Sequence, residues 1–160
     1  MEFPTVKYRI LTGLFIGMVA APALWAANVS VLIMELESEQ NKENTVNQYP
    51  ILWENGLMDA LFESGHIVTN SPKMQIAGNP DGDFPAEAER DFNSAQEGGM
   101  DYFLLAIIDY ATPVVSLRLF DIKSTKMVLE QKYKVTTFRN IKDESDKIKA
   151  AARVIAARLR

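Results

Sequence analysis

One apolar run constrains the fold of this chain more than any feature outside the amino-terminal segment. Residues 102–108 (YFLLAII) carry no charged residue and lie within the segment 101–111, in which Asp101 and Asp109 flank the apolar run. This run is far too short for a membrane-spanning helix, which needs about 20 residues. A short continuous apolar run is typical of a buried strand. We therefore predict that residues 101–111 form the central strand of a β-sheet.

Extended and helical patterns alternate along the rest of the chain. Strands are predicted where β-branched and apolar residues cluster, and helices where apolar residues recur at three- and four-residue steps. The predicted strands are residues 28–36, 66–69, 101–111, 115–119 and 128–138, and the predicted helices are residues 50–64, 86–97 and 142–159. Residues 71–85 contain three prolines and two glycines and are predicted to be a loop.

The first predicted helix begins at Pro50 and stops at Gly65, and its apolar stripe consists of Ile51, Leu57, Met58, Leu61 and Phe62. The strand at residues 28–36 is expected to be buried on both faces because it is apolar almost throughout.

The order of these elements is β-α-β-α-β-β-β-α. Strands that are separated by helices favour parallel pairing, and strands joined by short turns favour an antiparallel meander. The predicted fold class is therefore α/β (α+β), a single mixed five-stranded sheet with helices packed on it. No linker divides residues 28–160, so they are expected to form one domain.

The amino-terminal 27 residues have the pattern of a secretory signal peptide. Lys7 and Arg9 precede an uncharged stretch, residues 10–27, that ends in small residues. Cleavage after Ala26 or Ala27 fits because a polar residue follows, and Ala21-Pro22-Ala23 also has the small-x-small pattern. The alternative is an uncleaved anchor, since the stretch is about as long as a membrane-spanning helix.

Charge is divided unevenly along the mature region. Residues 28–122 contain 4 Lys+Arg and 16 Asp+Glu, whereas residues 123–160 contain 11 Lys+Arg and 4 Asp+Glu. An uneven division can mark a surface for an anionic partner, or the two segments can neutralise each other in the fold, which we favour. The acidic mature region has no nucleic-acid recognition motif, so no nucleic-acid partner is expected.

The sequence carries no recognisable catalytic or metal-binding signature. The absence of cysteine excludes disulfides and thiolate ligands, and the single histidine, His66, excludes a multi-histidine metal site within one chain. Asn79, Asp81 and Asp83 have the initial spacing of a calcium loop, but Phe84 replaces its glycine and Arg90 its final glutamate. We predict no catalytic, cofactor-binding or metal-binding residues, no cofactor, and no enzymatic activity.

Three residues are candidates for partner contacts. Tyr49 and Trp53 lie at the entrance of the first helix, where exposed aromatic residues could anchor a partner; the alternative is that they pack under the sheet. Asp109 lies at the carboxyl end of the central strand, the place where ligands of open α/β sheets often bind. The alternative for Asp109 is that it marks the point at which the strand reaches water.

Several segments resemble one family of exported α/β domains. They are VSVLIMEL at the first strand, LMDALFESGHIVTNSP at the helix–Gly–strand unit, AQEGGMDYFLLAIID before and within the central strand, and VSLRLFDIKSTKMVLEQ at the following hairpin. They are similar to the family of the TolB amino-terminal domain, CsgG and LpoB over residues 28–160. The resemblance implies an envelope-associated binding or assembly domain. Lipid anchoring through cysteine does not carry over, because the chain has no cysteine.

We therefore predict a non-enzymatic accessory or binding domain of the cell envelope that acts through protein–protein contacts, at a sheet edge or through the polar loop at residues 38–49. Its expected location is the periplasm, with extracellular release or a retained anchor as alternatives, and it is expected to meet the membrane only during export. Two other functions stay open, a homo-oligomeric envelope subunit that uses the surface of the first helix, and a small hydrolase that uses Asp109 and Asp121.

Overall fold

The computed structural model describes residues 26–37, 48–78, 80, 82, 84–135 and 141–159. The expected signal peptide up to residue 25, most of the polar loop at 38–49, and Asn79, Asp81 and Asp83 therefore lie outside the described residues. Within the described part, no helix has the length and apolar character needed to cross a membrane.

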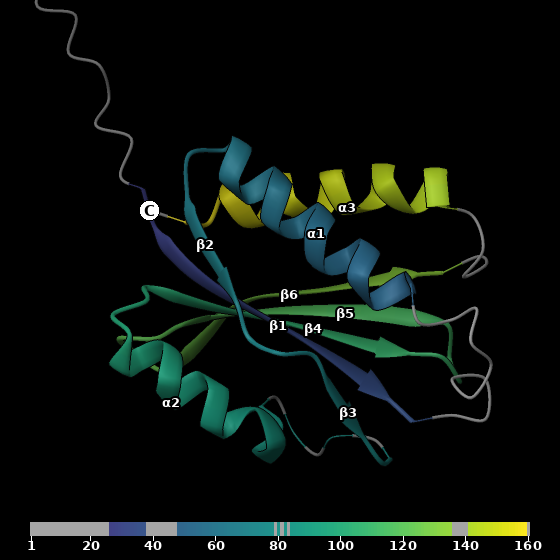
Figure 1. Ribbon diagram of the computed structural model, residues 1–160, viewed down its shortest axis with the longest axis horizontal. Coiled ribbons are helices and arrows are strands. Elements are labelled where there is room, and N and C mark those ends of the chain that lie inside the picture. The colour runs from purple at the N-terminus through teal and green to yellow at the C-terminus, as the bar shows by residue number, and fades with distance from the viewer. Residues whose placement is uncertain are drawn as a thin grey trace, which may run out of the picture.

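The fold is a mixed sheet with helices on both faces (Figure 1). The elements follow the chain in the order β1 (Asn28–Leu36), α1 (Gln48–Glu63), β2 (Ile67–Asn70), β3 (Met74–Ile76), a 3-10 turn η2 (Ala86–Ala88), α2 (Glu89–Glu97), β4 (Tyr102–Asp109), β5 (Val114–Asp121), β6 (Lys126–Lys134) and α3 (Ile141–Ala156). Helices α1 and α3 cover one face of the sheet, and α2 lies on the other (Figure 1).

The strand order is β2-β1-β4-β5-β6, and β3 also pairs with β1. Strand β1 is parallel to β2, β3 and β4, whereas β4, β5 and β6 form an antiparallel meander. The predicted fold class, the mixed pairing and the central position of β4 are thereby confirmed. The sheet has six strands and not five, because residues 71–85, predicted to be a loop, contain the short strand β3.

Two apolar cores lie on opposite faces of the sheet because neighbouring residues of a strand point to opposite faces. On β1, Ile33 packs into the core under α1 and α3, and Met34 packs into the core next to α2. The predicted burial of β1 on both faces is confirmed, since its residues from Val29 to Leu36 are all buried.

Helix α1 buries a different stripe from the predicted one. Trp53, Leu57 and Leu61 are fully buried, whereas Ile51 is 46% and Phe62 is 73% exposed. Each helical residue turns by about 100°, so Phe62 lies roughly half a turn around the helix from the line set by Trp53. The prediction that Ile51 and Phe62 belong to the core stripe was wrong.

Glycines follow the first two of the three predicted helices at the expected places. Gly65 follows α1 with a φ of 89°, and Gly99 follows α2 with a φ of 72°. These left-handed conformations cost glycine little, because it has no Cβ. They redirect the chain into β2 and β4 and so position the strands on either side of β1.

Candidate functional site

Tyr49 and Trp53, two of the three residues predicted to contact a partner, lie inside the protein. Tyr49 is 4% and Trp53 is 0% exposed. The Trp53 ring packs against Tyr133 of β6, with 5.9 Å between ring centroids. The structure therefore agrees with packing under the sheet, the alternative that the sequence left open, and neither side chain is on the surface in this conformation.

Two tyrosine–glutamate hydrogen bonds lie on this face of the sheet, one between α1 and α3 and the other between β1 and the turn after β4. The Tyr49 hydroxyl donates to Glu144 Oε2 of α3 at 2.7 Å, and the Tyr110 hydroxyl donates to Glu35 Oε2 of β1 at 3.0 Å. Both carboxylates are buried, and each has a lysine partner as well, Lys147 at 2.8 Å and Lys73 at 3.4 Å.

Burial is the main cause that raises the pKa of both tyrosines above the ordinary value, and the adjacent carboxylates add to the shift. The hydroxyls therefore stay protonated and act as donors. Sequence analysis missed these contacts because their partners are 75 and 95 residues apart in the chain.

Asp109, the third candidate, is at the surface, where its carboxylate closes the turn between β4 and β5. Asp109 Oδ1 accepts the backbone N–H groups of Ala111 at 2.8 Å and Thr112 at 3.1 Å, and Oδ2 accepts the hydroxyl of Thr112. Such contacts are typical of an aspartate that initiates a turn. They agree with the alternative that Asp109 marks the point at which the strand reaches water.

The proposed carboxylate pair for hydrolysis, Asp109 and Asp121, is far apart. In the β4–β5 register Tyr102 faces Asp121 at one end and Asp109 faces Val114 at the other. Seven steps of about 3.3 Å place the backbones of the two residues roughly 23 Å apart along the strands. Glycoside hydrolysis needs a separation of about 5–9.5 Å. This pair therefore cannot act together on one bond, and the alternative of a hydrolase that uses these two carboxylates is not supported. Among the described residues, no group of three or more His, Asp or Glu side chains could hold a metal ion.

On the face of the sheet that carries α2, strands β5 and β6 are largely uncovered by this helix. Helix α2 has only nine residues. The strand residues that pack in the core beneath it come chiefly from β1, β4 and the end of β5. A shallow groove of about 320 Å³ follows the uncovered part. It is lined by Leu36, Pro80, Ile107, Asp109, Thr112, Val114, Ser116, Arg118 and Lys132.

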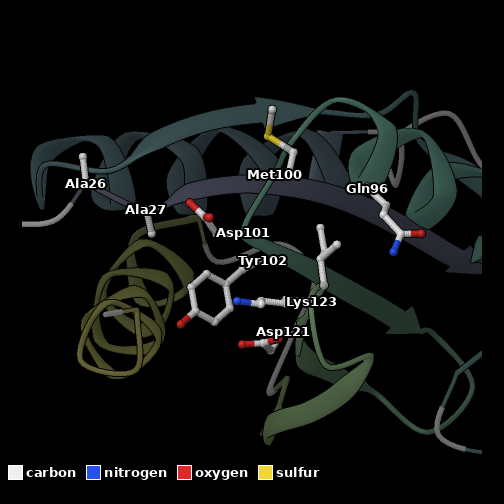
Figure 2. A pocket seen from close by; sticks show the side chains of 9 residues that line it. Ala26, Ala27, Gln96, Met100, Asp101, Tyr102, Asp121 and Lys123 are labelled. Carbon is white, nitrogen blue, oxygen red and sulfur yellow. The ribbon is translucent and has the colours of Figure 1, made fainter.

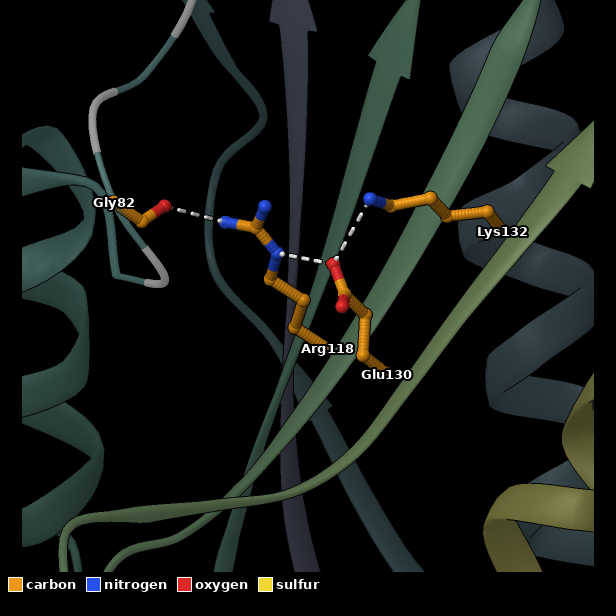
Figure 3. Close-up of polar contacts among 4 residues, drawn as sticks. All are labelled: Gly82, Arg118, Glu130 and Lys132. Atoms are coloured by element: carbon orange, nitrogen blue, oxygen red, sulfur yellow. Dashed lines mark hydrogen bonds and ion pairs between the residues drawn. The ribbon is translucent and has the colours of Figure 1, made fainter.

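A charged cluster forms one wall of this groove (Figure 3). Arg118 Nε lies 3.4 Å from Glu130 Oε1, and the same oxygen lies 3.4 Å from Lys132 Nζ. Arg118 also donates to the backbone oxygen of Gly82 at 3.2 Å. The Arg118 side chain is 13% exposed and that of Lys132 is 61% exposed. Arg118 is thus held in place, whereas Lys132 can reach a partner.

Strand β6 is the outer strand of the sheet beside this cluster. Its residues alternate between exposed and half-buried along the whole strand. Lys126, Lys132 and Lys134 are exposed on it, together with Glu130. The edge is therefore basic, and its outward backbone N–H and C=O groups face away from β5.

A second hollow, of about 310 Å³, lies at the opposite end of the sheet, where β1 and β4 begin and β5 ends (Figure 2). Its walls include Ala26, Ala27, Asp101, Asp121 and Lys123. Hydrogen bonds from Ser124 lower the pKa of Asp121, so this carboxylate is ionised at neutral pH.

A comparison with protein-family models identifies the family. A model described as "Uncharacterised protein" matches residues 32–159, from within β1 to beyond the end of α3. The chain belongs to this family. The family match therefore includes β6, the charged cluster beside it and both helices that cover the other face. A comparison with curated proteins gives no match.

Solved structures resemble the chain at the level of the fold. TolB from Acinetobacter baumannii is 16% identical with a TM-score of 0.47, and the match covers 82% of this chain and 28% of TolB. A PelC dodecamer from Paraburkholderia phytofirmans is 13% identical with a TM-score of 0.45, and the match covers 84% and 90% of the two chains. The carboxy-terminal domain of LpoB from Escherichia coli is 16% identical with a TM-score of 0.37, and the match covers 75% and 90%.

The chain thus spans about a quarter of the length of TolB. The resemblance to TolB and LpoB that the sequence motifs indicated is confirmed as a weak resemblance of fold. The resemblance to CsgG stays a prediction.

Proposed function

We propose that this protein is an exported, non-enzymatic component of the cell envelope that binds another envelope protein through the edge of its sheet. The observation that carries the proposal is the outer strand β6, a nine-residue basic strand with an open groove beside it. An exposed strand edge can accept an extended segment of a partner, whose backbone then continues the sheet.

The chemistry of the edge selects the partner. Four basic residues, Lys126, Lys132, Lys134 and Arg118, lie on β6 or next to it, and Glu130 is the acidic residue among them. An extended segment with acidic side chains at alternate positions would place its charges opposite these cations. Exposed lysines also discourage uncontrolled pairing between sheet edges, so the same residues favour one partner and disfavour aggregation.

Export is part of the proposal and is supported by the signal-peptide pattern of residues 1–27. The described fold begins where that pattern ends, since Ala27 is buried and β1 starts at Asn28. The periplasm is the proposed location. Cell fractionation tests it, and finding the folded precursor in the cytosol would contradict it.

Site-specific crosslinking in the native cell tests the binding surface. A photo-reactive residue replaces Lys132 on β6 in one variant and Lys149 on α3 in the matched control, because both lysines are exposed. We expect a single crosslinked species from position 132 and none from position 149. The second variant K132E should reduce co-purification of that species, whereas K149E should not. Recovery of the free monomer alone, or equal crosslinking from positions 132 and 149, would contradict the proposal.

A homo-oligomeric subunit is the second candidate, and the exposed side of α1 favours it. Phe62 and Ile51 are both large, apolar and exposed on this helix. They share one face of α1 but lie about 16 Å apart along its axis, and apolar side chains exposed on one face can mark a contact with another molecule. Light scattering of the purified protein separates the two candidates, because a subunit of this kind would form oligomers that the substitution F62S disrupts.

A further inference from the structure

The first two residues that the structure describes, Ala26 and Ala27, differ in burial. Ala26 is exposed, whereas Ala27 is 4% exposed and packs in the core under α1 and α3. The carbonyl oxygen of Ala27 accepts the N–H of Ile67 at 3.0 Å, and the N–H of Ala27 donates to His66 Nδ1 at 3.3 Å. The fold therefore uses the chain from Ala27 onward.

Hydrogen-bond acceptors lie close to the backbone of Ala27 and Asn28. Asp101 Oδ2 accepts the backbone N–H of Asn28 at 2.8 Å and its side-chain amide at 3.2 Å. Ala26, Ala27, Asp101 and Asp121 border the same hollow, with Lys123 as its cation (Figure 2). The backbone amide of Ala27, which carries no charge, thus contacts an imidazole nitrogen, next to the carboxylate of Asp101 and in the same hollow as that of Asp121.

We propose that the bond cut on export is the one between Ala26 and Ala27, and that the α-ammonium group this cut creates on Ala27 is bound by His66 Nδ1 beside Asp101 and Asp121. The inference rests on the proposed export. A leader-cleaving protease adds one water molecule across the amide bond, so that Ala26 leaves with a carboxylate and Ala27 keeps the amino group. That group is protonated near neutral pH, since its ordinary pKa is about 7.7–8.0.

The other two predicted cleavage positions fit the structure less well. Cleavage after Ala27 would remove a buried side chain and both hydrogen bonds of this residue, leaving His66 Nδ1 without its donor. Cleavage after Ala23 would keep three further residues, and the nitrogen of Ala27 would stay a neutral amide. A cut after Ala27 would also bring an ammonium group, that of Asn28, to Asp101 Oδ2, so the burial and the two hydrogen bonds of Ala27 decide between these two cuts.

The amino-terminal residue of the processed protein is the first test. The full chain is expressed in an exporting host, recovered from the envelope fraction, and examined by intact mass and amino-terminal sequencing. We expect the chain to begin at Ala27. A chain from the envelope fraction that begins at Asn28 or Leu24, or that retains Met1, overturns the inference but leaves the proposed export intact, whereas a precursor found only in the cytosol overturns both.

The second test asks whether the new ammonium group is bound. The variant A26R retains the leader, because a small residue is needed before the cut and Ala26 is exposed. The substitution D101N is measured in the processed protein and in the A26R background, in the same detergent. We expect D101N to lower Tm by about 2–5 °C more in the processed protein, as an interaction of about 1 kcal/mol would.

The substitution D59N on α1 is the matched control, because Asp59 is an exposed aspartate outside the hollow. It should have the same effect in both backgrounds. Equal effects of D101N in the two backgrounds would overturn the binding of the ammonium group, even if the chain begins at Ala27.

Discussion

His66 is the residue whose environment has the clearest consequence for stability. It lies between α1 and β2 and is nearly buried, and its Nδ1 accepts the N–H of Ala27. Only a neutral imidazole can accept at Nδ1 in this way. Desolvation lowers the pKa of His66 below the ordinary value of about 6.5. Protonation therefore costs more in the folded protein than in the unfolded chain.

Lowering the pH from 7 to 5 is expected to destabilise the protein through His66. In this range the unfolded chain takes up a proton that the folded protein resists, so the free energy of unfolding falls as the pH drops below about 6.5. His66 is the only histidine, and the lowered pKa of Asp121 acts only at lower pH. Urea unfolding at several pH values checks this. The variant H66Q should remove most of the slope between pH 7 and 5, and an unchanged slope would contradict the assignment.

The sequence could identify candidate residues, but it could not predict which residues they contact in the folded protein. Trp53, Leu57 and Leu61 have a four-residue spacing that predicts a buried stripe, and this signal was available for Trp53. The partners of Tyr49 and Tyr110 were not predictable, because Glu144 and Glu35 come close only after the sheet and helices assemble. Position 132 on the edge was equally hidden, since a sequence does not show which strand of a meander is outermost.

Among the elements, α1 and α3 pack tightly against each other at Gly56. A Cβ atom at this position would lie 2.7 Å from Cγ2 of Ile148, which is 1% exposed. Real Cβ contacts are not this short, and a buried β-branched side chain has little freedom to move. The glycine is therefore a packing requirement of the α1–α3 pair.

The substitution G56A is expected to destabilise the protein despite the better helix propensity of alanine. Overpacking costs about 1–3 kcal/mol, and the gain in helix propensity is about 1 kcal/mol. In the I148A background the clash disappears and only the propensity gain is left, so G56A should then be neutral or stabilising. Chemical unfolding of the four proteins of this double-mutant cycle measures the change of sign. Equal effects of G56A in both backgrounds would show that steric contact with Ile148 does not require glycine at position 56.

Local patterns predicted the long elements well and the short ones poorly. The bounds of β1 agree with the prediction at both ends, because the segment is β-branched or apolar almost throughout. Strand β3 was missed because it has three residues and lies between prolines and glycines. It exists through pairing with β1, which includes the hydrogen bond from the N–H of Glu37 to the oxygen of Ile76 at 2.8 Å. Such non-local pairing leaves no periodic signal in the sequence.

For the whole molecule, the acidic and basic parts of the chain form elements that lie next to each other in the fold. The acidic first part supplies α1, β1 and β4, and the basic last part supplies β6 and α3. Helix α3 packs beside α1, and Arg118 pairs with Glu130 across β5 and β6. This ion pair joins a cation of the acidic part to an anion of the basic part, so it does not decide between the two interpretations of the uneven charge, and the β6 edge is a local basic surface.

The two cores are expected to unfold together, because they share the central strands. Ile33 of β1 lies in the core under α1 and α3, and Ile107 of β4 lies in the core next to α2. The variants I33V and I107V should each lower the free energy of unfolding by about 0.5–1.5 kcal/mol. Each should shift a single transition in both near- and far-ultraviolet circular dichroism, with an unchanged dependence on denaturant. If I107V instead separated a second transition while I33V did not, the α2 side would be an independent unit, and residues 28–160 would not fold as one domain.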